Sequence, residues 1–426
     1  MIEQLLQQLR GKRILIAGFG REGKSSLRFI KNQLPDAAVA VADKNPNCAT
    51  ALATIDPTIP FFGGEHYLQQ LNNFDLLLKS PGIKLEILLP EKLQISSQTD
   101  LFLSAFNAQI IGITGTKGKS TTASLIHHIL INSGLPALLT GNMGIPSFDI
   151  IDQITPKSIV VFELSAHQLQ FVRHSPHLSV LLNIFEEHLD YFGELVNYRN
   201  AKLNLVRFAG KGDYAVLHRA MRQYVYGLQA NISYFPQDDG FALPMTLLGA
   251  HNRLNIEAAL MATACFGVSK EEGLAALVSF KSLPHRLEYI GQRGGLHFYN
   301  DSIATIPEAV IAALEAIPQT NFLILGGFDR GIHYQSLVSF LLVKPVDTVF
   351  YVGKAGRRIA ELLQQQNYSG QLISIENLQQ VFTHLKETAE AGNTCLLSPA
   401  AASYDQFENF EQRGKLFKQL AEEFGK

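Results

Sequence analysis

The stretch that decides the fold is residues 108–130, AQIIGITGTKGKSTTASLIHHIL. Its apolar run IIGIT leads into the glycine-rich turn Gly115–Thr121, and a helical pattern follows directly. Glycines allow backbone N–H groups to converge on phosphate oxygens, and the start of a helix adds a positive dipole end. In such a loop Lys119 would reach the phosphates of a nucleotide and Ser120 would ligate Mg²⁺. Ile113 stands where the strict phosphate-loop pattern has its first glycine, so a glycine-rich turn without a ligand is the alternative.

Strands and helices alternate on both sides of this stretch. Short apolar runs that suit buried strands are RILIAG, AVAVAD and FDLLLKS before it, and SIVVFELS, LSVLLNIF, DYAVLH, HFYNDS, NFLILGGFD, TVFYVG and NTCLLSPA after it. Alternating strands and helices predict parallel, doubly wound sheets. We therefore expect an α/β protein of three domains: a Rossmann-like N-terminal domain, a central P-loop ATPase-type domain with a mainly parallel sheet, and a Rossmann-like C-terminal domain. The expected domain boundaries are 1–98, 99–288 and 289–426.

Length, charge and cysteine content exclude several classes of protein. The chain has 426 residues, and at about 150 residues per domain this length predicts two or three domains. Lys and Arg number 36 against 38 Asp and Glu, a net charge of -2, so no general basic field would attract nucleic acid or an anionic membrane. The 3 cysteines are far apart and form no disulfide framework or zinc motif. We expect a soluble, cytoplasmic protein, because no apolar run approaches the roughly 20 residues that span a bilayer.

A second glycine-rich turn lies near the N-terminus. Gly18, Gly20 and Gly23 form a G-x-G-x-x-G pattern after a strand, and Asp43 ends the next strand. The pattern is typical of a site for a diphosphate beside a ribose, whose hydroxyl Asp43 would bind. A nicotinamide dinucleotide and a UDP-containing ligand both meet that description. A tight turn without any ligand is the third possibility.

Acidic and imidazole side chains follow two of the central strands. Glu163 comes directly after one apolar run, and NIFEEHLDYFG places His188 with three carboxylates after another. Ligands of doubly wound sheets gather at the carboxyl ends of the strands, and Mg²⁺ prefers oxygen ligands. Glu163 is therefore the candidate metal ligand. Composition alone favours an ordinary polar loop residue at His188.

Polar residues also end strands of the third expected domain. They occur in Asn300–Ser302, Leu325–Gly331 and Leu397–Ala400. Polar groups that converge from several strand ends indicate a pocket for a second substrate.

Ordered motifs along the whole chain resemble those of the Mur ligase family. They are GITGTKGKSTT, GNMGIPSF, FELSAHQL, HLDYFGELVNYRNAKLNLV, GAHNRLNIEAALMA, LPHRLE, YNDSIAT, LGGFDRG and LLSPAAASYDQFENFEQRG. The resemblance implies an ATP-dependent ligase that forms an amide bond and releases ADP and phosphate. It implies that glutamate, with D-glutamate favoured, is added to UDP-N-acetylmuramoyl-L-alanine through an acyl phosphate. This is a cytoplasmic step of peptidoglycan precursor synthesis, which serves cell-wall growth, cell shape and division.

The resemblance also assigns residues to each ligand. For ATP it implies Gly115, Thr116, Lys117, Gly118, Lys119, Ser120, Thr121, Asn252, Asn255, Arg286 and Asp301. For the UDP-linked substrate it implies Gly18, Gly20, Arg21, Glu22, Gly23, Asp43, Ser80, Pro81, Gly82 and Asn142. For glutamate it implies Thr305, Arg330, Ser403, Tyr404 and Phe410.

The family's chemistry implies two Mg²⁺ sites. The metal ligands would be Ser120, Glu163, His188 and Lys202, the last as a carbamate. Carbamylation turns an ammonium into an anionic oxygen ligand, whereas the sequence alone would make Lys202 a solvated helix residue. The resemblance likewise reverses the preference stated above for His188. The catalytic residues would be Lys119, Asn142, Glu163, His188 and Lys202.

Two positions depart from familiar D-glutamate enzymes of the family. Ile303 in NDSIAT replaces a lysine, which removes one cation for the carboxylates of glutamate, and Arg330 replaces a lysine in LGGFDRG. Arg330 could compensate with a bidentate grip, or the pocket could prefer L-glutamate, which one branch of the family adds. Two further alternatives are an NAD-linked oxidoreductase, which leaves the second phosphate loop unexplained, and a nucleotide-binding scaffold that has lost catalysis. We expect a monomer.

Overall fold

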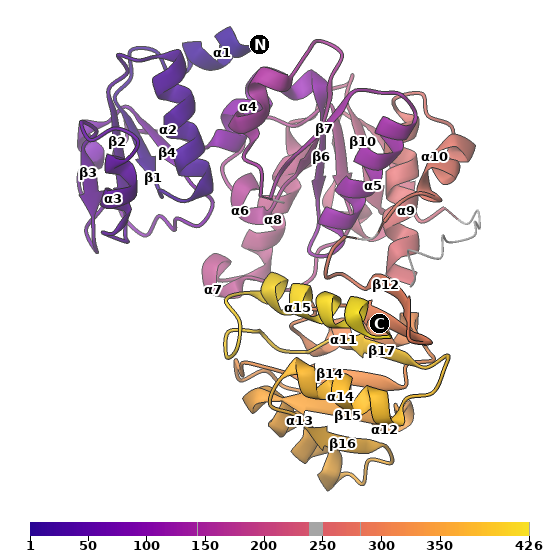
Figure 1. Cartoon of the computed structure of the whole chain (residues 1–426). Helices are drawn as coiled ribbons and strands as arrows, with labels where there is room; N and C mark the ends of the chain where they lie inside the picture. Colours follow the sequence, from indigo (N-terminus) through magenta and orange to yellow (C-terminus); the bar gives the residue numbers. More distant parts are fainter. Residues whose placement is uncertain (143, 238–249, 282, 426) are drawn as a thin grey trace. The chain divides into compact units, whose positions relative to one another are not determined.

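The computed structural model describes residues 1–142, 144–237, 250–281 and 283–425 of the chain. The chain packs as two compact units, one of Met1–Gly240 with Leu254–Val278 and the other of Phe241–Arg253 with Ser279–Lys426. The first unit carries two sheets and the second carries one (Figure 1). No helix in the described ranges is both long and apolar enough to cross a membrane.

The first sheet is parallel and has the strand order β3-β2-β1-β4-β5. Its strands are β1 (Ile14–Ala17), β2 (Val39–Asp43), β3 (Phe61–Gly63), β4 (Leu76–Lys79) and β5 (Gln94–Ser96). The helices of this part are α1 (Ile2–Gln7), α2 (Arg21–Gln33), α3 (Cys48–Ala53), η1 (Leu71–Asn73) and α4 (Gln98–Phe106). In β1, Ile14 and Ile16 belong to one apolar core and Leu15 and Ala17 to another. The sheet is therefore packed on both faces, which explains the continuous apolar run.

The second sheet is also parallel, with the order β11-β10-β9-β6-β8-β7. Its strands are β6 (Ile110–Thr114), β7 (Ala137–Gly141), β8 (Ile159–Glu163), β9 (Leu178–Leu181), β10 (Tyr214–His218) and β11 (Asn231–Phe235). The helices that follow η2 (Asn107–Gln109) along the chain are α5 (Lys119–Asn132), η3 (Ser147–Gln153), α6 (Ala166–Leu169), α7 (Leu189–Phe192), α8 (Leu195–Arg207), η4 (Arg219–Tyr224), α9 (Ala250–Ala264) and α10 (Lys270–Leu277). All residues of β6 are buried. The stretch that predicted the fold thus supplies an inner strand and the helix after it.

The third sheet has the order β12-β13-β17-β14-β15-β16, and only its β12–β13 pairing is antiparallel. Its strands are β12 (Glu288–Arg293), β13 (Leu296–Asn300), β14 (Phe322–Gly326), β15 (Thr348–Val352), β16 (Gln371–Ser374) and β17 (Thr394–Leu397). Its helices are α11 (Pro307–Ala316), α12 (Gln335–Val343), α13 (Gly353–Gln365), α14 (Leu378–Thr388) and α15 (Phe410–Glu423).

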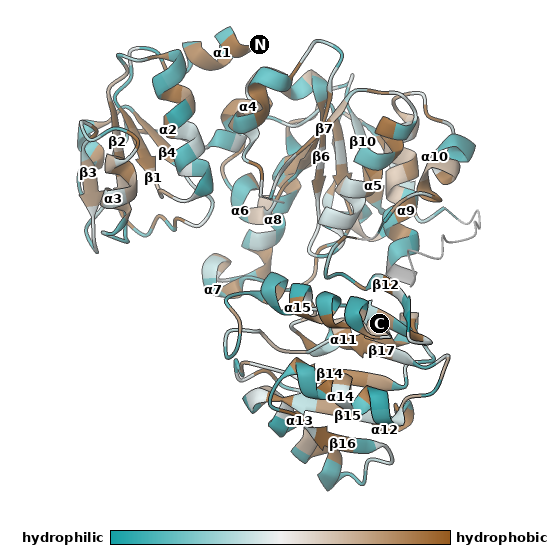
Figure 2. Ribbon diagram, in the orientation of Figure 1, coloured by the Kyte–Doolittle hydropathy of each residue, from teal (hydrophilic) through white to brown (hydrophobic). Residues whose placement is uncertain are grey.

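The third sheet is packed on both faces, as its two apolar cores show. In β14, Leu323 and Leu325 share one core with α11, α12 and α13, whereas Phe322 and Ile324 share the other with α14 and α15. Figure 2 shows that β14 and β15 are mainly apolar, whereas helices such as α14 and α15 carry both polar and apolar residues. The α/β class with mainly parallel sheets, expected from the sequence, is confirmed. The boundaries 1–98, 99–288 and 289–426 stay predictions.

Candidate active site

The glycine-rich turn joins β6 to α5 as a compact loop. Gly118 caps α5 with a left-handed backbone (φ 86°), which glycine adopts without strain. The Lys119 ammonium donates to the carbonyl oxygens of Gly115 and Thr116, each at 2.9 Å. The two asparagines expected at ATP lie buried near the start of α9, and they are Asn252 and Asn255. A lysine folded over a glycine-rich loop at a helix N-terminus is the arrangement that binds nucleotide phosphates.

The carboxylate of Glu163 is buried at the end of β8 and lacks one partner. Its Oε1 accepts from the Asn142 side-chain amide at 3.0 Å. Its Oε2 is buried without a hydrogen-bond partner among the described residues, and so is the hydroxyl of Thr121. Leaving a buried carboxylate oxygen unpaired is costly, so this site fits a cation. In the described part of the chain no three His, Cys, Asp or Glu side chains are placed so that they could hold a metal ion together, so phosphate oxygens and water would have to complete a Mg²⁺ shell.

Lys202 of α8 is buried against the phosphate loop, with 1% of its surface exposed. Its Nζ donates to the Gly115 carbonyl oxygen at 2.7 Å and lies 4.8 Å from the ring centre of Tyr198. Burial lowers the pKa of Lys202 well below the ordinary 10.5, and the positive charge of Lys119 lowers it further. This environment favours the neutral amine more than water does. Only that form has the electron pair needed to react with CO₂ and give a carbamate.

His188 lies beside two rings and a carboxylate. Its ring centre is 4.9 Å from that of His167 and 6.0 Å from that of Tyr198, and its Nε2 lies 3.9 Å from Glu187 Oε2. Burial lowers the pKa of His167 to about 4, and the charge of His188 adds to this effect. At neutral pH His167 is therefore uncharged. The side chain of His188 is 47% exposed, so its imidazole can reach a ligand.

Several of these side chains line one cleft of about 370 Å³ in the first unit, and Glu163 adjoins it through its hydrogen bond with Asn142. The predicted residues that line it are Pro81, Gly82, Lys119, Asn142, His188 and Lys202. Five further residues, which the sequence assigns to no ligand, also line it, namely Ser165, Ala166, His167, Glu187 and Tyr198. Tyr198 stands four residues before Lys202 on α8, a spacing that places both on one helix face. That spacing was the available signal for Tyr198.

The N-terminal glycine turn packs on the turn Ser80–Gly82. The Ser80 hydroxyl donates to the carbonyl oxygen of Gly18 at 2.8 Å. The Asp43 carboxylate accepts from the backbone N–H groups of Phe19 at 2.7 Å and Asn45 at 2.8 Å. The two turns expected at the UDP-linked substrate thus lie together, and Asp43 holds the shape of the first.

In the second unit, Asp301 supports the backbone next to Arg286. Its carboxylate accepts from the backbone N–H of Leu287 at 3.0 Å and from the Ser398 hydroxyl at 2.9 Å. Burial raises the pKa of Asp301 to about 7. Leu287 has a left-handed backbone (φ 44°), a strained state for leucine that neighbouring contacts must hold. Asp301 therefore fixes the backbone of the turn in which Arg286 lies.

The residues expected at glutamate lie on loops of the third sheet and at the start of α15. The guanidinium of Arg330 lies 5.4 Å from the ring centre of Tyr404. Ser403 is buried, Thr305 is partly exposed, and Phe410 is the first residue of α15. An arginine beside an exposed aromatic ring can hold a carboxylate.

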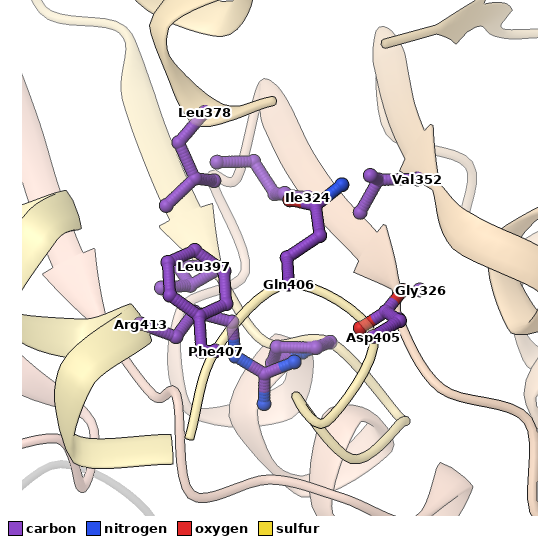
Figure 3. Close-up of a pocket in the computed structure, with 11 residues that line it drawn as sticks. Ile324, Gly326, Val352, Leu378, Leu397, Asp405, Gln406, Phe407 and Arg413 are labelled. Atoms are coloured by element: carbon purple, nitrogen blue, oxygen red, sulfur yellow. The ribbon is translucent and has the colours of Figure 1, made fainter. Parts of the chain in front are cut away.

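The side chain of Arg413 helps to line a small pocket, together with Asp405, Gln406 and Phe407 of the loop 403–409 (Figure 3). Arg413 is only 4% exposed, and its Nη1 has no hydrogen-bond partner among the described residues. Its Nε donates to the Ser302 hydroxyl at 3.0 Å, and its Nη2 donates to the carbonyl oxygens of Ser302 at 2.8 Å and Ala401 at 3.0 Å. The buried guanidinium thus ties the loop after β13 to the loop after β17.

Family models match three successive parts of the chain. They describe a Mur ligase MurD-like N-terminal domain at residues 12–99, a Mur ligase middle domain at 113–231 and a Mur ligase glutamate ligase domain at 285–401. Relatives that match nearly the whole chain are named as ligases of the same family. A UDP-N-acetylmuramoylalanine–D-glutamate ligase of Acidobacterium capsulatum is 32% identical over 97% of this chain and 96% of its own. One of Desulfovibrio desulfuricans is 33% identical over 97% and 98%.

The chain belongs to the Mur ligase family. Solved Mur ligases share its fold. MurF from Acinetobacter baumannii has a TM-score of 0.64 at 18% identity and covers 99% of this chain and 98% of its own. MurF from Thermotoga maritima, solved with ADP, has a TM-score of 0.61 at 17% identity and covers 98% and 96%. Because the chain belongs to a ligase family, the alternative that it is an NAD-linked oxidoreductase is rejected.

In this Mur ligase, Glu22 connects the N-terminal glycine turn to helix α6, which follows β8. Its Oε1 accepts from the side-chain amide of Gln168 at 2.7 Å, and Gln168 in turn accepts from the backbone N–H of Ser165 at 2.9 Å. Glu22 Oε2 is buried without a partner among the described residues. Burial raises the pKa of Glu22 to about 7, against the smaller lowering effects of Gln168 and Lys79.

We expect Glu22→Gln to flatten the pH dependence of stability. The raised pKa means that the folded Mur ligase holds this proton more tightly than the unfolded chain, whose value is 4.5. The protonated Glu22 therefore stabilises the folded protein fully below the pKa of the unfolded chain. As pH rises through the pKa of the folded protein, the free energy of unfolding falls by something on the order of 3 kcal/mol. Thermal unfolding between about pH 4 and pH 8 would measure the change.

Glu91→Gln is the matched control for this prediction, because Glu91 is exposed. It should leave the pH slope of the wild-type protein unchanged. Equal slopes in the Glu22→Gln and Glu91→Gln variants would contradict the prediction.

Proposed function

We propose that the protein is an ATP-dependent ligase that adds glutamate to UDP-N-acetylmuramoyl-L-alanine in peptidoglycan precursor synthesis. Because both nucleotide substrates occur inside the cell, we place the reaction in the cytoplasm. The observation that carries the proposal is the cleft that gathers Lys119, Asn142, His188 and Lys202 beside the turn 80–82. Relatives that match nearly the whole chain bear the name of this ligase, and the glutamate ligase domain matched at residues 285–401 supports the same acceptor.

Amide formation requires an activated carboxylate. In the proposed reaction a carboxylate oxygen of the UDP-linked substrate attacks the γ-phosphorus of ATP, the bond to the β-phosphate oxygen breaks, and ADP leaves. The amine of glutamate then attacks the carbonyl carbon of the acyl phosphate, the carbon–oxygen bond breaks, and phosphate leaves while the amine loses a proton. Phosphorylation is needed because a carboxylate oxygen is otherwise a poor leaving group. The attacking amine must be neutral, so a base has to take its proton.

The residues of the cleft, together with the adjoining Ser120 and Glu163, fit these steps. Lys119 and the N-terminus of α5 would hold the phosphates and stabilise the charge of the transferred phosphoryl group. Glu163 and Ser120 would hold one Mg²⁺, and the unpartnered Glu163 Oε2 supports this assignment. His188 and a carbamylated Lys202 would hold the second. Bound Mg²⁺ neutralises phosphate charge.

D-Glutamate is the acceptor that we favour, and L-glutamate is the alternative. Ile303 offers no charge to the acceptor, whereas Arg330 can grip a carboxylate through two N–H groups. The two isomers carry the same carboxylates, so this grip alone does not separate them. The relatives named as D-glutamate ligases favour the D isomer.

Phosphate release from ATP should require UDP-N-acetylmuramoyl-L-alanine and glutamate together. The assay compares D- and L-glutamate at equal concentration, with omission of each substrate as the blank. Lys119→Ala should lower the rate by about 10²–10³-fold, because it removes a donor to the transferred phosphoryl group. Absence of stimulation by either isomer would contradict the proposed function. Stimulation by L-glutamate alone would contradict only the choice of isomer.

A further inference from the structure

Arg358 of α13 forms an ion pair beneath the loop that carries Arg330. Its Nη1 donates to both carboxylate oxygens of Asp329, at 2.7 Å and 2.8 Å. The side chain of Asp329 is only 7% exposed. The pKa of Asp329 lies below its ordinary value, chiefly because Arg358 donates to it. A charge-assisted contact to a buried carboxylate holds its partners more firmly than a solvated surface pair does.

The same pair fixes the backbone on both sides of Arg330. Asp329 precedes Arg330, and its Oδ1 also accepts from the backbone N–H of Gly331 at 2.9 Å. Arg358 Nη2 donates to the carbonyl oxygen of Ile332 at 3.2 Å. Gly331 has a left-handed backbone (φ 73°), so the chain turns directly after Arg330. The loop is thus tied to α13 while Arg330 itself is exposed.

The Arg330 side chain is supported from the other direction by aromatic contacts. Its guanidinium lies 5.4 Å from the Tyr404 ring centre, and Phe328 meets Tyr404 edge-on at 6.3 Å. Phe328 also forms a β-bridge with Ala402. A long cationic side chain loses rotamer entropy when it is fixed. Holding it in place beforehand lowers the cost of binding a ligand.

We infer that Arg358 is a positioning residue for the acceptor. It acts through Asp329 to hold the loop of Arg330, and so it sets the affinity for glutamate without touching it. The inference rests on the proposed function. At position 303, where familiar D-glutamate enzymes of the family have a lysine, Ile303 supplies no cation. Holding the acceptor carboxylates therefore depends more strongly on where Arg330 is placed.

The test compares Arg358→Ala with Arg357→Ala, its exposed neighbour on α13. Glutamate is varied, in the isomer that the wild-type protein uses, with ATP and the UDP-linked substrate saturating. Arg358→Ala should raise the KM for glutamate by about tenfold or more and leave the KM for ATP within about twofold. Arg357→Ala should change neither. Arg358→Lys, which keeps the charge but not the fork of donors, should give a smaller rise.

A double variant separates positioning from general damage. Asp329→Asn should reproduce the effect of Arg358→Ala, and the combined variant should be no worse than the poorer single one, because the pair acts as a unit.

Three results would overturn the inference. Equal KM values for glutamate in the Arg358→Ala and Arg357→Ala variants would do so, and so would a parallel rise in every KM with a lowered melting temperature. The third result is a wild-type protein without glutamate-dependent phosphate release, which would overturn the proposed function and this inference with it. If the wild-type protein is active and Arg358→Ala leaves its KM for glutamate unchanged, the inference alone is overturned.

Discussion

Lys202→Ala is expected to abolish phosphate release, with a loss of about a thousandfold or more. The expected reason is the loss of an anionic oxygen ligand, the carbamate, beside the phosphate loop, where charge develops during phosphoryl transfer. Such a loss corresponds to about 4 kcal/mol of transition-state stabilisation. Lys202 Nζ lies 2.7 Å from the Gly115 carbonyl oxygen, so a group added there would meet bound phosphates.

Chemical rescue distinguishes the carbamate from a packing role of Lys202. Formate or acetate should restore part of the activity of Lys202→Ala, because a short carboxylate can occupy the space left by the side chain. NMR of the wild-type protein in ¹³C-labelled bicarbonate should show a carbamate signal that the variant lacks. Arg207→Ala, an exposed change on the same helix, should leave activity intact. Full activity of Lys202→Ala, or a loss that no carboxylate rescues, would count against the carbamate.

Gly118→Ala is expected to lower kcat/KM for ATP by about a hundredfold, because misplacing a catalytic group by about 1 Å can cost that much. Gly118 is left-handed (φ 86°), and an added Cβ would overlap the side-chain oxygen of Asn255. Asn255 also accepts from the Thr122 hydroxyl at 3.3 Å. The methyl group would therefore shift the loop, the start of α5 or the asparagine expected at ATP.

Gly134→Ala, just beyond the other end of α5, is the matched control. Gly134 is also left-handed (φ 77°), but an added Cβ would meet nothing within 4 Å. Both substitutions should therefore cost about 1–2 kcal/mol in backbone strain, and Gly118→Ala should lower the melting temperature at least as far as Gly134→Ala, because it adds the overlap with Asn255. Only Gly118→Ala should lose ATP-dependent activity. Similar kinetics in the two variants would show that the overlap with Asn255 has no functional consequence.

The strands that could be predicted from the sequence are the inner ones. Every apolar run read as a strand lies in one of the three sheets, as β1, β2, β4, β6, β8, β9, β10, β13, β14, β15 and β17. The strands without such a signal are β3, β5, β7, β11, β12 and β16, and each lies at the edge of its sheet. An edge strand pairs on one side only and is less buried, so its sequence need not be continuously apolar.

The site residues that could be predicted from the sequence are those that come directly after a strand. The lysine of the phosphate loop and Glu163 could be found from local pattern alone, because a glycine turn and a carboxylate after an apolar run are contiguous features. His188 and Lys202 could be assigned only through the family resemblance. Lys202 has the pattern of a solvated helix residue, yet 1% of its surface is exposed.

The sequence by itself determined the α/β class, the two glycine turns and the family, because these depend on residues that are neighbours along the chain. Only the tertiary structure decided that Lys202 meets the loop at Gly115, that Glu22 meets Gln168, and that Arg358 holds Asp329. Each of these contacts joins residues far apart in sequence, and each changes what a titratable group does. The burial of a titratable side chain and the identity of its partner set its pKa and its position, and both are properties of packing. Hydrophobic periodicity predicts which face of a helix is buried, but not which distant side chain that face will meet.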